Sequence, residues 1–239
     1  MARIRRLRNR RDLRKGVAEL VAIDRSLKKI AKHADKLSIA QGEEGFEALL
    51  EIVVSQQLSS AAADTIFARV KERVVPFDPA TLLATDTEVL RQAGLSAPKQ
   101  KHMRSIASRI VSGELDLVRV ADMHDDEAHA HLIETSGIGP WTAQVYLMSS
   151  LKRADVWPAG DVALQAAVTK ALGLRKRPDI KQMIALGERW RPWRTVAARL
   201  FWTHYRVTLE IEKQKKLAAA AKKKNGAART NRTAARKRR

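Results

Sequence analysis

Asp161 is the carboxylate in this sequence that is best placed to do chemistry. It follows a Trp-Pro-Ala-Gly segment, residues 157–160, and directly precedes the apolar-periodic stretch 162–172, so it stands where the N-cap of a helix belongs. The amide N–H groups and dipole of a helix N-terminus keep a carboxylate ionised, which suits stabilisation of developing positive charge better than proton donation. At about 4 Å and an effective dielectric near 20, two such opposite charges attract by about 4 kcal/mol. The sequence therefore predicts either an electrostatic catalyst at Asp161 or a residue that only caps the helix.

A second candidate site precedes Asp161 in the chain. Leu132 and Ile133 end a predicted helix, Gly137 and Gly139 follow, and Pro140 starts the next helix. Glycine takes positive φ without a steric penalty, and proline suits the first helical position because its missing N–H is not needed there. Such a turn exposes amide N–H groups at a helix N-terminus, an arrangement that holds phosphate oxygens without reading sequence. The alternative is an ordinary αα-hairpin with glycines in its turn.

The elements that must position these residues are predicted to be helices. No run of the sequence shows sustained period-two alternation, whereas apolar residues recur at helical spacing through most of the chain. The predicted helices cover residues 17–31, 46–54, 59–74, 87–93, 98–112, 122–134, 141–151, 162–172, 178–189 and 192–210. We therefore expect an all-α protein.

The formal charge of +20 predicts a polyanionic partner. Residues 1–15 contain eight Lys or Arg and one Asp, and residues 211–239 contain twelve Lys or Arg and one Glu. Most of the positive charge is therefore at the two ends, and the chain between them is almost neutral. We predict a basic N-terminal arm over 1–15. Residues 211–239 have no apolar period, which predicts a disordered basic tail that either contacts duplex DNA non-specifically or serves only solubility.

Composition also excludes several classes. The chain has no Cys, so it forms no disulfide and cannot hold a Cys-ligated iron–sulfur cluster. The histidines at 124, 129 and 131 lack the i, i+4 spacing of metal-binding helices and are interpreted as a solvated face. No stretch approaches 18 apolar residues, and the Arg-rich start lacks the apolar core of a signal peptide. We expect a monomer without membrane contact, in the bacterial cytoplasm at the nucleoid.

Several further segments accompany the hairpin and Asp161. They are Phe46–Leu50 through Ser55–Ser59, Ala93–Lys99, and Arg191–Arg194 through Trp202. In order and spacing they resemble the helix-hairpin-helix (HhH-GPD) superfamily of DNA glycosylases, most closely the 3-methyladenine DNA glycosylase II group, over about residues 20 to 210. Lys99, Lys101 and Arg104 on the predicted helix 98–112 are candidate phosphate contacts, with surface solvation as the alternative.

The resemblance implies a two-lobed fold with a base-binding cleft between the lobes. One lobe would be residues 45–155, which include the helix-hairpin-helix at 132–151. The other would combine residues 16–44 with 156–210. Asp161 would stand on the wall of the cleft and the hairpin at its mouth.

The resemblance also implies roles at the reaction centre. Asp161 would be catalytic, and Trp141, Trp202 and Trp157 would bind an electron-poor, alkylated base through their aromatic faces. Each of these tryptophans has burial in the core as its alternative. Position 141 is where strand-cutting members carry a Schiff-base Lys, so a Trp there implies a monofunctional enzyme.

DNA contacts and a cation site are implied in the same way. The backbone of Gly137, Ile138 and Gly139, with Thr142, would bind the duplex. Gln57 or Leu58 would fill the gap left by an extruded nucleotide, although Leu58 is equally well explained as a core residue. Carbonyl oxygens at the hairpin often hold Na⁺ or K⁺ in this superfamily, and the corresponding residues are Ile133, Thr135 and Ile138.

The predicted function is base-excision repair of double-stranded DNA. The enzyme would flip out alkylated purines of the 3-methyladenine and 7-methylguanine type, hydrolyse the N-glycosidic bond and leave an abasic site, with no required cofactor. Two alternatives stay open. One is a non-catalytic helix-hairpin-helix module that binds damaged or distorted DNA, and the other is a glycosylase for deaminated bases.

Overall fold

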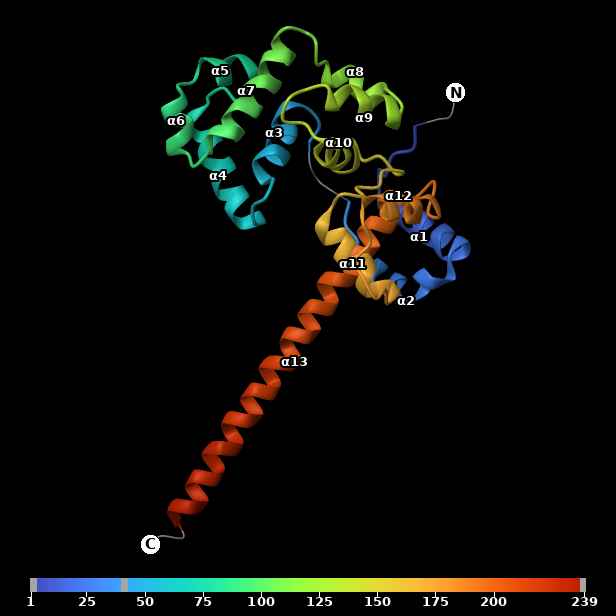
Figure 1. The fold of residues 1–239 in the computed structure, drawn as a ribbon, viewed down its shortest axis with the longest axis vertical. Coiled ribbons are helices and arrows are strands. Elements are labelled where there is room, and N and C mark those ends of the chain that lie inside the picture. Colours follow the sequence, from blue (N-terminus) through green and yellow to red (C-terminus); the bar gives the residue numbers. More distant parts are fainter. Residues whose placement is uncertain (1–3, 40–42, 237–239) are drawn as a thin grey trace.

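The fold is helical throughout. The computed structural model describes residues 4–39 and 43–236, with side chains as far as residue 217. Within these ranges all regular elements are helices, and an isolated bridge joins Arg6 to Arg153. Figure 1 shows two lobes side by side and one long helix that projects from them. The prediction of an all-α, two-lobed fold is confirmed.

The central lobe is a run of short helices around an apolar core. Its elements are α3 (Phe46–Ser55), α4 (Ser60–Arg73), α5 (Pro79–Ala84), α6 (Thr87–Gln92), α7 (Ala97–Val111), α8 (Leu117–Asp122), α9 (Asp125–Ile133), α10 (Pro140–Val145) and a π-helical turn over Tyr146–Ser150. The local sequence defines the starting points of α4, α5, α6 and α8, because Ser59, Asp78, Asp86 and Asp116 each accept a backbone N–H from the helix that follows. In place of the single helix predicted over 141–151, the structure has α10 followed by the π-helical turn.

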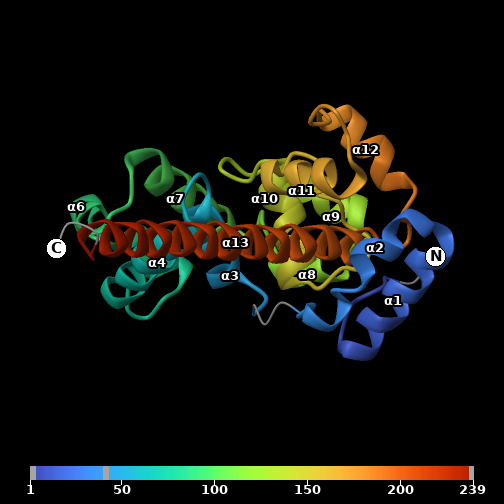
Figure 2. The same cartoon turned by 90° about the horizontal axis from the view of Figure 1, so that it is seen from below.

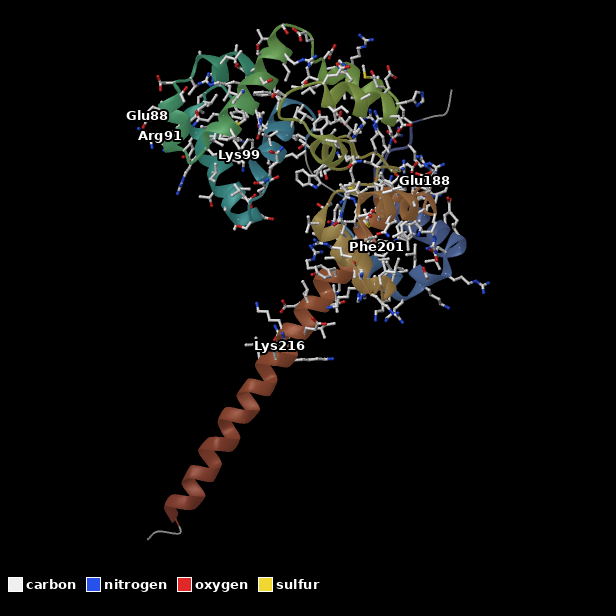
Figure 3. The ribbon with its side chains drawn as sticks, viewed as in Figure 1. Glu88, Arg91, Lys99, Glu188, Phe201 and Lys216 are labelled. Carbon is white, nitrogen blue, oxygen red and sulfur yellow. The ribbon has the colours of Figure 1, made fainter. Side chains whose placement is uncertain are left out.

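The second lobe joins the two ends of the folded chain. It contains α1 (Arg10–Ile23), α2 (Lys28–Ala31), α11 (Val162–Leu172), α12 (Ile180–Glu188) and the first part of α13 (Arg194–Arg236). In its core, the rings of Trp157, Trp190 and Phe201 pack against one another with centroids 5.0 to 6.3 Å apart. Phe201 is on α13, which is therefore anchored in this core (Figure 3).

The first helix begins earlier than predicted. Asn9 accepts the amide N–H groups of Arg11 and Asp12, so α1 starts at Arg10 rather than at residue 17. It ends at Ile23, where Asp24 adopts an extended backbone and caps a short 3₁₀ turn ahead of α2. The single helix predicted over 17–31 is therefore two helices with a break at Asp24.

Part of the predicted N-terminal arm is built into the fold. The amide of Leu7 donates to the carbonyl of Lys152 at 2.7 Å, and the amide of Ala154 donates to Arg5 at 2.9 Å. Leu7 is buried. Residues 5–7 therefore join the segment between the lobes instead of forming a free basic arm.

The structure continues α13 as a helix to Arg236, where the sequence predicts a disordered tail over 211–239. Residues 237–239 lie outside the described part of the chain. Ala, Lys and Arg are strong helix formers, and the packed first half of α13 supplies the helix nucleus that an isolated segment would lack. Figure 1 shows the second half projecting clear of both lobes, and Figure 2 shows it directed toward the α4–α6 side. Lys216 lies on this projecting part (Figure 3). No helix in the described ranges combines the length and apolar character needed to cross a membrane.

Candidate active site

The hairpin between α9 and α10 forms a compact turn. Ile138 donates its amide N–H to the carbonyl of Thr135 at 3.0 Å, and Ala143 donates to Gly139 at the same distance, which starts α10. Gly137 has φ of 96°, so this position requires a residue without a Cβ. Gly139 has an ordinary φ of −80°, and nothing lies within 4 Å of the place where its Cβ would be. Glycine at 139 therefore leaves the backbone uncovered rather than relieving strain.

A second turn, residues 55–58, connects α3 to α4. The amide of Leu58 donates to the carbonyl of Ser55 at 3.1 Å, while Gln56 has φ −52° and ψ 125° and Gln57 has φ 58°. These values are typical of a type II turn, whose third position favours glycine. Gln57 is exposed there and Leu58 is 40% exposed. The turn thus presents both predicted wedge residues to solvent.

Two side chains hold this turn in place: Gln56, which sequence reasoning did not assign to the site, and Lys99, which it named as a candidate phosphate contact. Gln56 donates from Nε2 to the carbonyl of Gly137 at 3.2 Å and to Oγ1 of Thr142 at 2.9 Å, which ties the turn to the hairpin. Lys99 donates from Nζ to the carbonyls of Val54 and Gln56 at 2.5 and 2.9 Å. Burial lowers the pKa of Lys99. Lys99 is thus committed to the end of α3 and is not a free phosphate contact (Figure 3).

Arg104 is also engaged within the protein. Its guanidinium donates to the carbonyl of Leu83 at 2.8 Å and also bonds Thr85, at the end of α5. Carbonyls at a helix C-terminus lack partners within the helix, and a guanidinium satisfies them well. Of the three predicted cationic phosphate contacts on α7, Lys101 alone has an exposed side chain.

Asp161 caps α11 and receives two indole N–H groups. Its Oδ1 accepts from the amide of Leu164 at 2.6 Å and from Nε1 of Trp202 at 3.3 Å. Its Oδ2 accepts from Nε1 of Trp141 at 2.8 Å. The capping prediction is therefore met, and the two tryptophans present their polar edges, not their faces, to the carboxylate.

These parts surround one groove between the lobes, with a volume of about 900 Å³. It is lined by Ser55, Gln56, Gln57, Leu58, His102, Ile133, Thr135, Ser136, Gly137, Ile138, Gly139, Trp141, Thr142, Gly160, Asp161, Val162 and Ala163. Among the described residues, Asp161 and His102 are the titratable ones that line it, and no Lys or Arg does. Trp202 reaches the groove only through its hydrogen bond to Asp161.

Trp157 is a correction to the sequence prediction. Its side chain is 4% exposed, packs against Trp190 and Phe201, and donates from Nε1 to the carbonyl of Met183 at 2.8 Å. A Cβ at Gly187 would lie 2.6 Å from its ring. Trp157 is therefore a core residue that fixes the loop ahead of Asp161, and it does not reach the groove to bind a base.

A second cavity at the lobe junction has a volume of about 290 Å³. In contrast to the groove, it is lined by several acidic side chains together with arginines. Asp155 accepts from Nε of Arg194 at 2.9 Å and from Nη1 of Arg191 at 2.9 Å. Arg191 and Arg194 both pair with Glu188 on α12 as well (Figure 3). In the described part of the chain, no group of three or more His, Asp or Glu side chains is arranged to hold a metal ion.

Buried Arg153 connects this junction to the central lobe. It has no exposed surface, donates from Nη2 to the carbonyls of Ala121 and Met123 at 2.8 and 2.9 Å, and lies 3.4 Å from Oδ1 of Asp125. Burial lowers the pKa of Arg153 and raises that of Asp125. In both groups burial opposes the charged form, whereas the attraction between Arg153 and Asp125 favours it.

Comparisons with known proteins identify the family. The family model described as HhH-GPD superfamily base excision DNA repair protein matches residues 50–192. The chain is 34% identical over 165 residues to DNA-3-methyladenine glycosylase 1 of Schizosaccharomyces pombe, which covers 67% of this chain and 72% of that protein. The chain belongs to the HhH-GPD superfamily of base excision DNA repair proteins.

Solved structures give the same result. A 3-methyladenine DNA glycosylase of Schizosaccharomyces pombe in complex with abasic DNA superposes with a TM-score of 0.72 at 30% identity, over 79% of this chain and 95% of that one. A DNA-3-methyladenine glycosidase of Bacillus halodurans has a TM-score of 0.71 at 29% identity, over 87% and 95%. These two structures share both the fold and detectable sequence similarity with this chain.

Proposed function

We propose that this protein is a DNA-3-methyladenine glycosylase of base excision repair, which removes alkylated purines from double-stranded DNA. The observation that supports it best is the position of Asp161, a carboxylate held by three N–H donors on the wall of a groove whose described lining contains no Lys or Arg. The similar proteins named above are glycosylases of this kind, and one of them was solved with abasic DNA.

The chemistry follows from the charge of the substrate. An N-alkylated purine is cationic, so it leaves as a neutral base when the glycosidic bond breaks and takes the bonding electrons with it. Positive charge then builds on the sugar, and water adds to C1′ and loses a proton. Asp161 stabilises the positive sugar in the transition state and orients the water. The attraction between the carboxylate and the sugar charge is about 4 kcal/mol when they are about 4 Å apart.

The proposed enzyme is monofunctional. A strand-cutting member needs an amine that attacks C1′ and forms a Schiff base. Here position 141 is Trp, and its Nε1 donates a hydrogen bond to Asp161. We therefore expect abasic products whose strands stay intact, and no protein–DNA adduct after borohydride treatment.

The proposal also includes a bound monovalent cation at the hairpin and a location in the cytoplasm. Main-chain carbonyl oxygens of Ile133, Thr135 and Ile138 at the hairpin would offer uncharged donors of the kind that suits Na⁺ or K⁺, and the Thr135 carbonyl also accepts the amide N–H of Ile138. A bound cation would add positive charge beside the hairpin amides. The enzyme would act on nucleoid DNA in the cytoplasm, as a monomer.

Release of a free base from alkylated DNA tests the proposal. Genomic DNA treated with a methylating agent is incubated with the full chain, and the released bases are identified by chromatography and mass spectrometry, with Asp161→Asn as the control. We expect 3-methyladenine and 7-methylguanine from the wild type and almost none from the variant. If duplexes with hypoxanthine or uracil released base instead, the deaminated-base alternative would replace the proposal. Tight duplex binding without release of any base would favour the non-catalytic module.

A further inference from the structure

His102 is a groove residue that the sequence gives no reason to select. It lies on α7, far from the hairpin in the chain, yet it lines the same groove as Gly137 and Gly139. The hairpin packs closely against it, because a Cβ at Gly137 would meet the Cβ of His102 and lie 2.7 Å from its Cγ. The imidazole is therefore held directly beside the hairpin amides.

The two ring nitrogens of His102 differ in their burial. Nδ1 of His102 is buried and has no hydrogen-bond partner among the described residues. Nε2 is not among the buried unpaired atoms of the described side chains and makes no hydrogen bond with them, so it is open to solvent. A neutral imidazole carries its hydrogen on one nitrogen, and a buried N–H without an acceptor is costly. The favoured tautomer thus carries the hydrogen on Nε2, which donates outward.

The groove has few other side chains that could favour an anion. No Lys or Arg is among its described lining residues, and its one carboxylate, Asp161, repels phosphate. The amides of Gly137 and Gly139 are neutral donors, whereas the amide of Ile138 already donates to the carbonyl of Thr135. A histidine N–H beside them adds the one nitrogen donor on a basic side chain among the described residues that line the groove.

We propose that His102 donates from Nε2 to the DNA phosphate held at the Gly137–Gly139 hairpin. The inference rests on the proposed seating of duplex DNA in this groove. The histidine binds DNA and positions it, and it takes no part in bond cleavage at Asp161. Because hydrogen bonds to charged groups are stronger than those between neutral groups, loss of the donor should weaken binding about 10-fold or more.

Two amide substitutions test the position of the donor. In His102→Gln the side-chain nitrogen can reach the place of Nε2, whereas in His102→Asn it lies near the buried Nδ1. Binding to a duplex that contains a non-cleavable abasic-site analogue is measured by fluorescence anisotropy. We expect His102→Asn and His102→Leu to bind about 10-fold more weakly than wild type, and His102→Gln to stay within about 3-fold. Lys181→Ala removes an exposed charge on α12, outside the residues that line the groove, and should stay within about 2-fold.

The outcomes separate this inference from the proposed function. Unchanged affinity in His102→Leu and His102→Asn would overturn it, as would equal weakening in His102→Gln and His102→Asn. Equal weakening in Lys181→Ala would overturn it too, because general surface charge would then explain the loss. Melting temperatures exclude unfolded variants, and His102→Ala replaces any that fails to fold. The assay scores binding alone, so a protein that binds the analogue but releases no base fails the proposed function and still tests His102.

Discussion

The groove and the second cavity at the lobe junction contrast in the charge of their lining residues. The groove is lined by backbone, apolar and uncharged polar side chains, and Asp161 is the one acid among its described lining residues. The other cavity is lined by Asp125, Asp126, Asp155 and Glu188 together with Arg191 and Arg194. In the groove, the carboxylate is held by N–H groups that carry no formal charge. In the second cavity, carboxylates are held by guanidinium groups.

The difference agrees with the catalytic role proposed for Asp161 in the groove. A carboxylate paired with a guanidinium is neutralised and cannot oppose a new positive charge, so a catalytic acid is better held by neutral dipoles. Ion pairs with several hydrogen bonds per guanidinium fix geometry, which suits the segment that joins the lobes. Asp155 and Asp161 are only a few residues apart, yet Asp155 is paired with Arg194, whereas Asp161 is not paired with any Lys or Arg of the described chain.

The largest expected effect is the loss of excision in Asp161→Asn. Asn has no net charge to oppose the oxocarbenium ion, so single-turnover base release should fall about 1,000-fold, while binding to an abasic-analogue duplex stays close to wild type. Asn still caps α11, although its amide nitrogen offers no acceptor to Trp141, and Asp161→Ala loses the cap as well, at about 1 kcal/mol. Excision, binding and melting are measured on all three proteins. Near wild-type excision in Asp161→Asn would show that Asp161 is only a cap.

Arg153 gives the largest expected effect in the junction. Arg153→Met leaves the carbonyls of Ala121 and Met123 and the acid of Asp125 without their partner, so the unfolding free energy should fall by about 3 kcal/mol. Excision per folded molecule should not change. Arg191→Gln, at a surface pair, should cost less than about 1 kcal/mol. Denaturant unfolding measures both, and equal costs would mean that burial of Arg153 does not matter.

The fold and the centre of the site could be predicted because their signals are local. Gly137, Pro140 and the cap at Asp161 each follow from backbone chemistry within a few residues, and the structure has the turn, the helix start and the cap where those residues stand. Asn9 is a residue type that favours a helix N-cap, so the start of α1 could also have been predicted. The surrounding arginines instead led to the prediction of a basic arm.

Interactions between distant segments could not be predicted in this way. Gln56 bonds Thr142, and His102 packs under Gly137, through pairings that only the folded chain creates. Trp157 and Trp141 are both tryptophans near the hairpin, and tertiary packing alone decides that one is in the core and the other at Asp161. Charge and aromatic type are therefore weaker guides to the site than backbone signals.

Removal of residues 211–239 tests whether positive charge acts from outside the groove. Because no Lys or Arg is among the described residues that line the groove, we expect the projecting end of α13 to supply part of the attraction to phosphate. The slope of log affinity against log salt should flatten by about 0.9 for each phosphate that the truncated protein no longer neutralises, while single-turnover base release stays nearly constant. An unchanged slope would mean that the tail does not touch the duplex. A large fall in the chemical step would mean that residues beyond 210 contribute to the site.

Substitution of Trp141 and Trp202 tests whether their indole N–H groups hold the Asp161 carboxylate in position for excision. Trp141→Phe removes the 2.8 Å donor and should lower single-turnover excision about 10-fold, and Trp202→Phe removes the longer 3.3 Å donor and should have a smaller effect. In an Asp161→Asn background, Trp141→Phe should then have almost no effect, since the two residues act together. A full effect in that background would mean that Trp141 acts on the base through its aromatic face.

The smallest expected effect is a pH dependence at the ion-paired cavity. Burial raises the pKa of Asp125 above its usual 3.8, despite attraction to Arg153 and Arg194, and repulsion from Asp155 and Asp126 acts in the same direction as burial. Between pH 3.8 and the pKa that Asp125 has in the folded protein, the folded protein therefore binds more protons at Asp125 than the unfolded chain does. The contribution of Asp125 to stability is thus fully present below 3.8 and is lost as the pH rises through the folded pKa.

Asp125→Asn isolates this contribution, because Asn keeps an oxygen for Arg153 and does not titrate. The unfolding free energy of wild type minus that of the variant should decrease as the pH rises from about 3 to about 6. Chemical denaturation at several pH values measures it. An increase over the same range would mean that attraction to Arg153 outweighs desolvation, and that the charges of this cavity contribute net stability as ordinary surface pairs do. A decrease would sharpen the contrast with the groove, because desolvated charge would then carry a net cost in the ion-paired cavity.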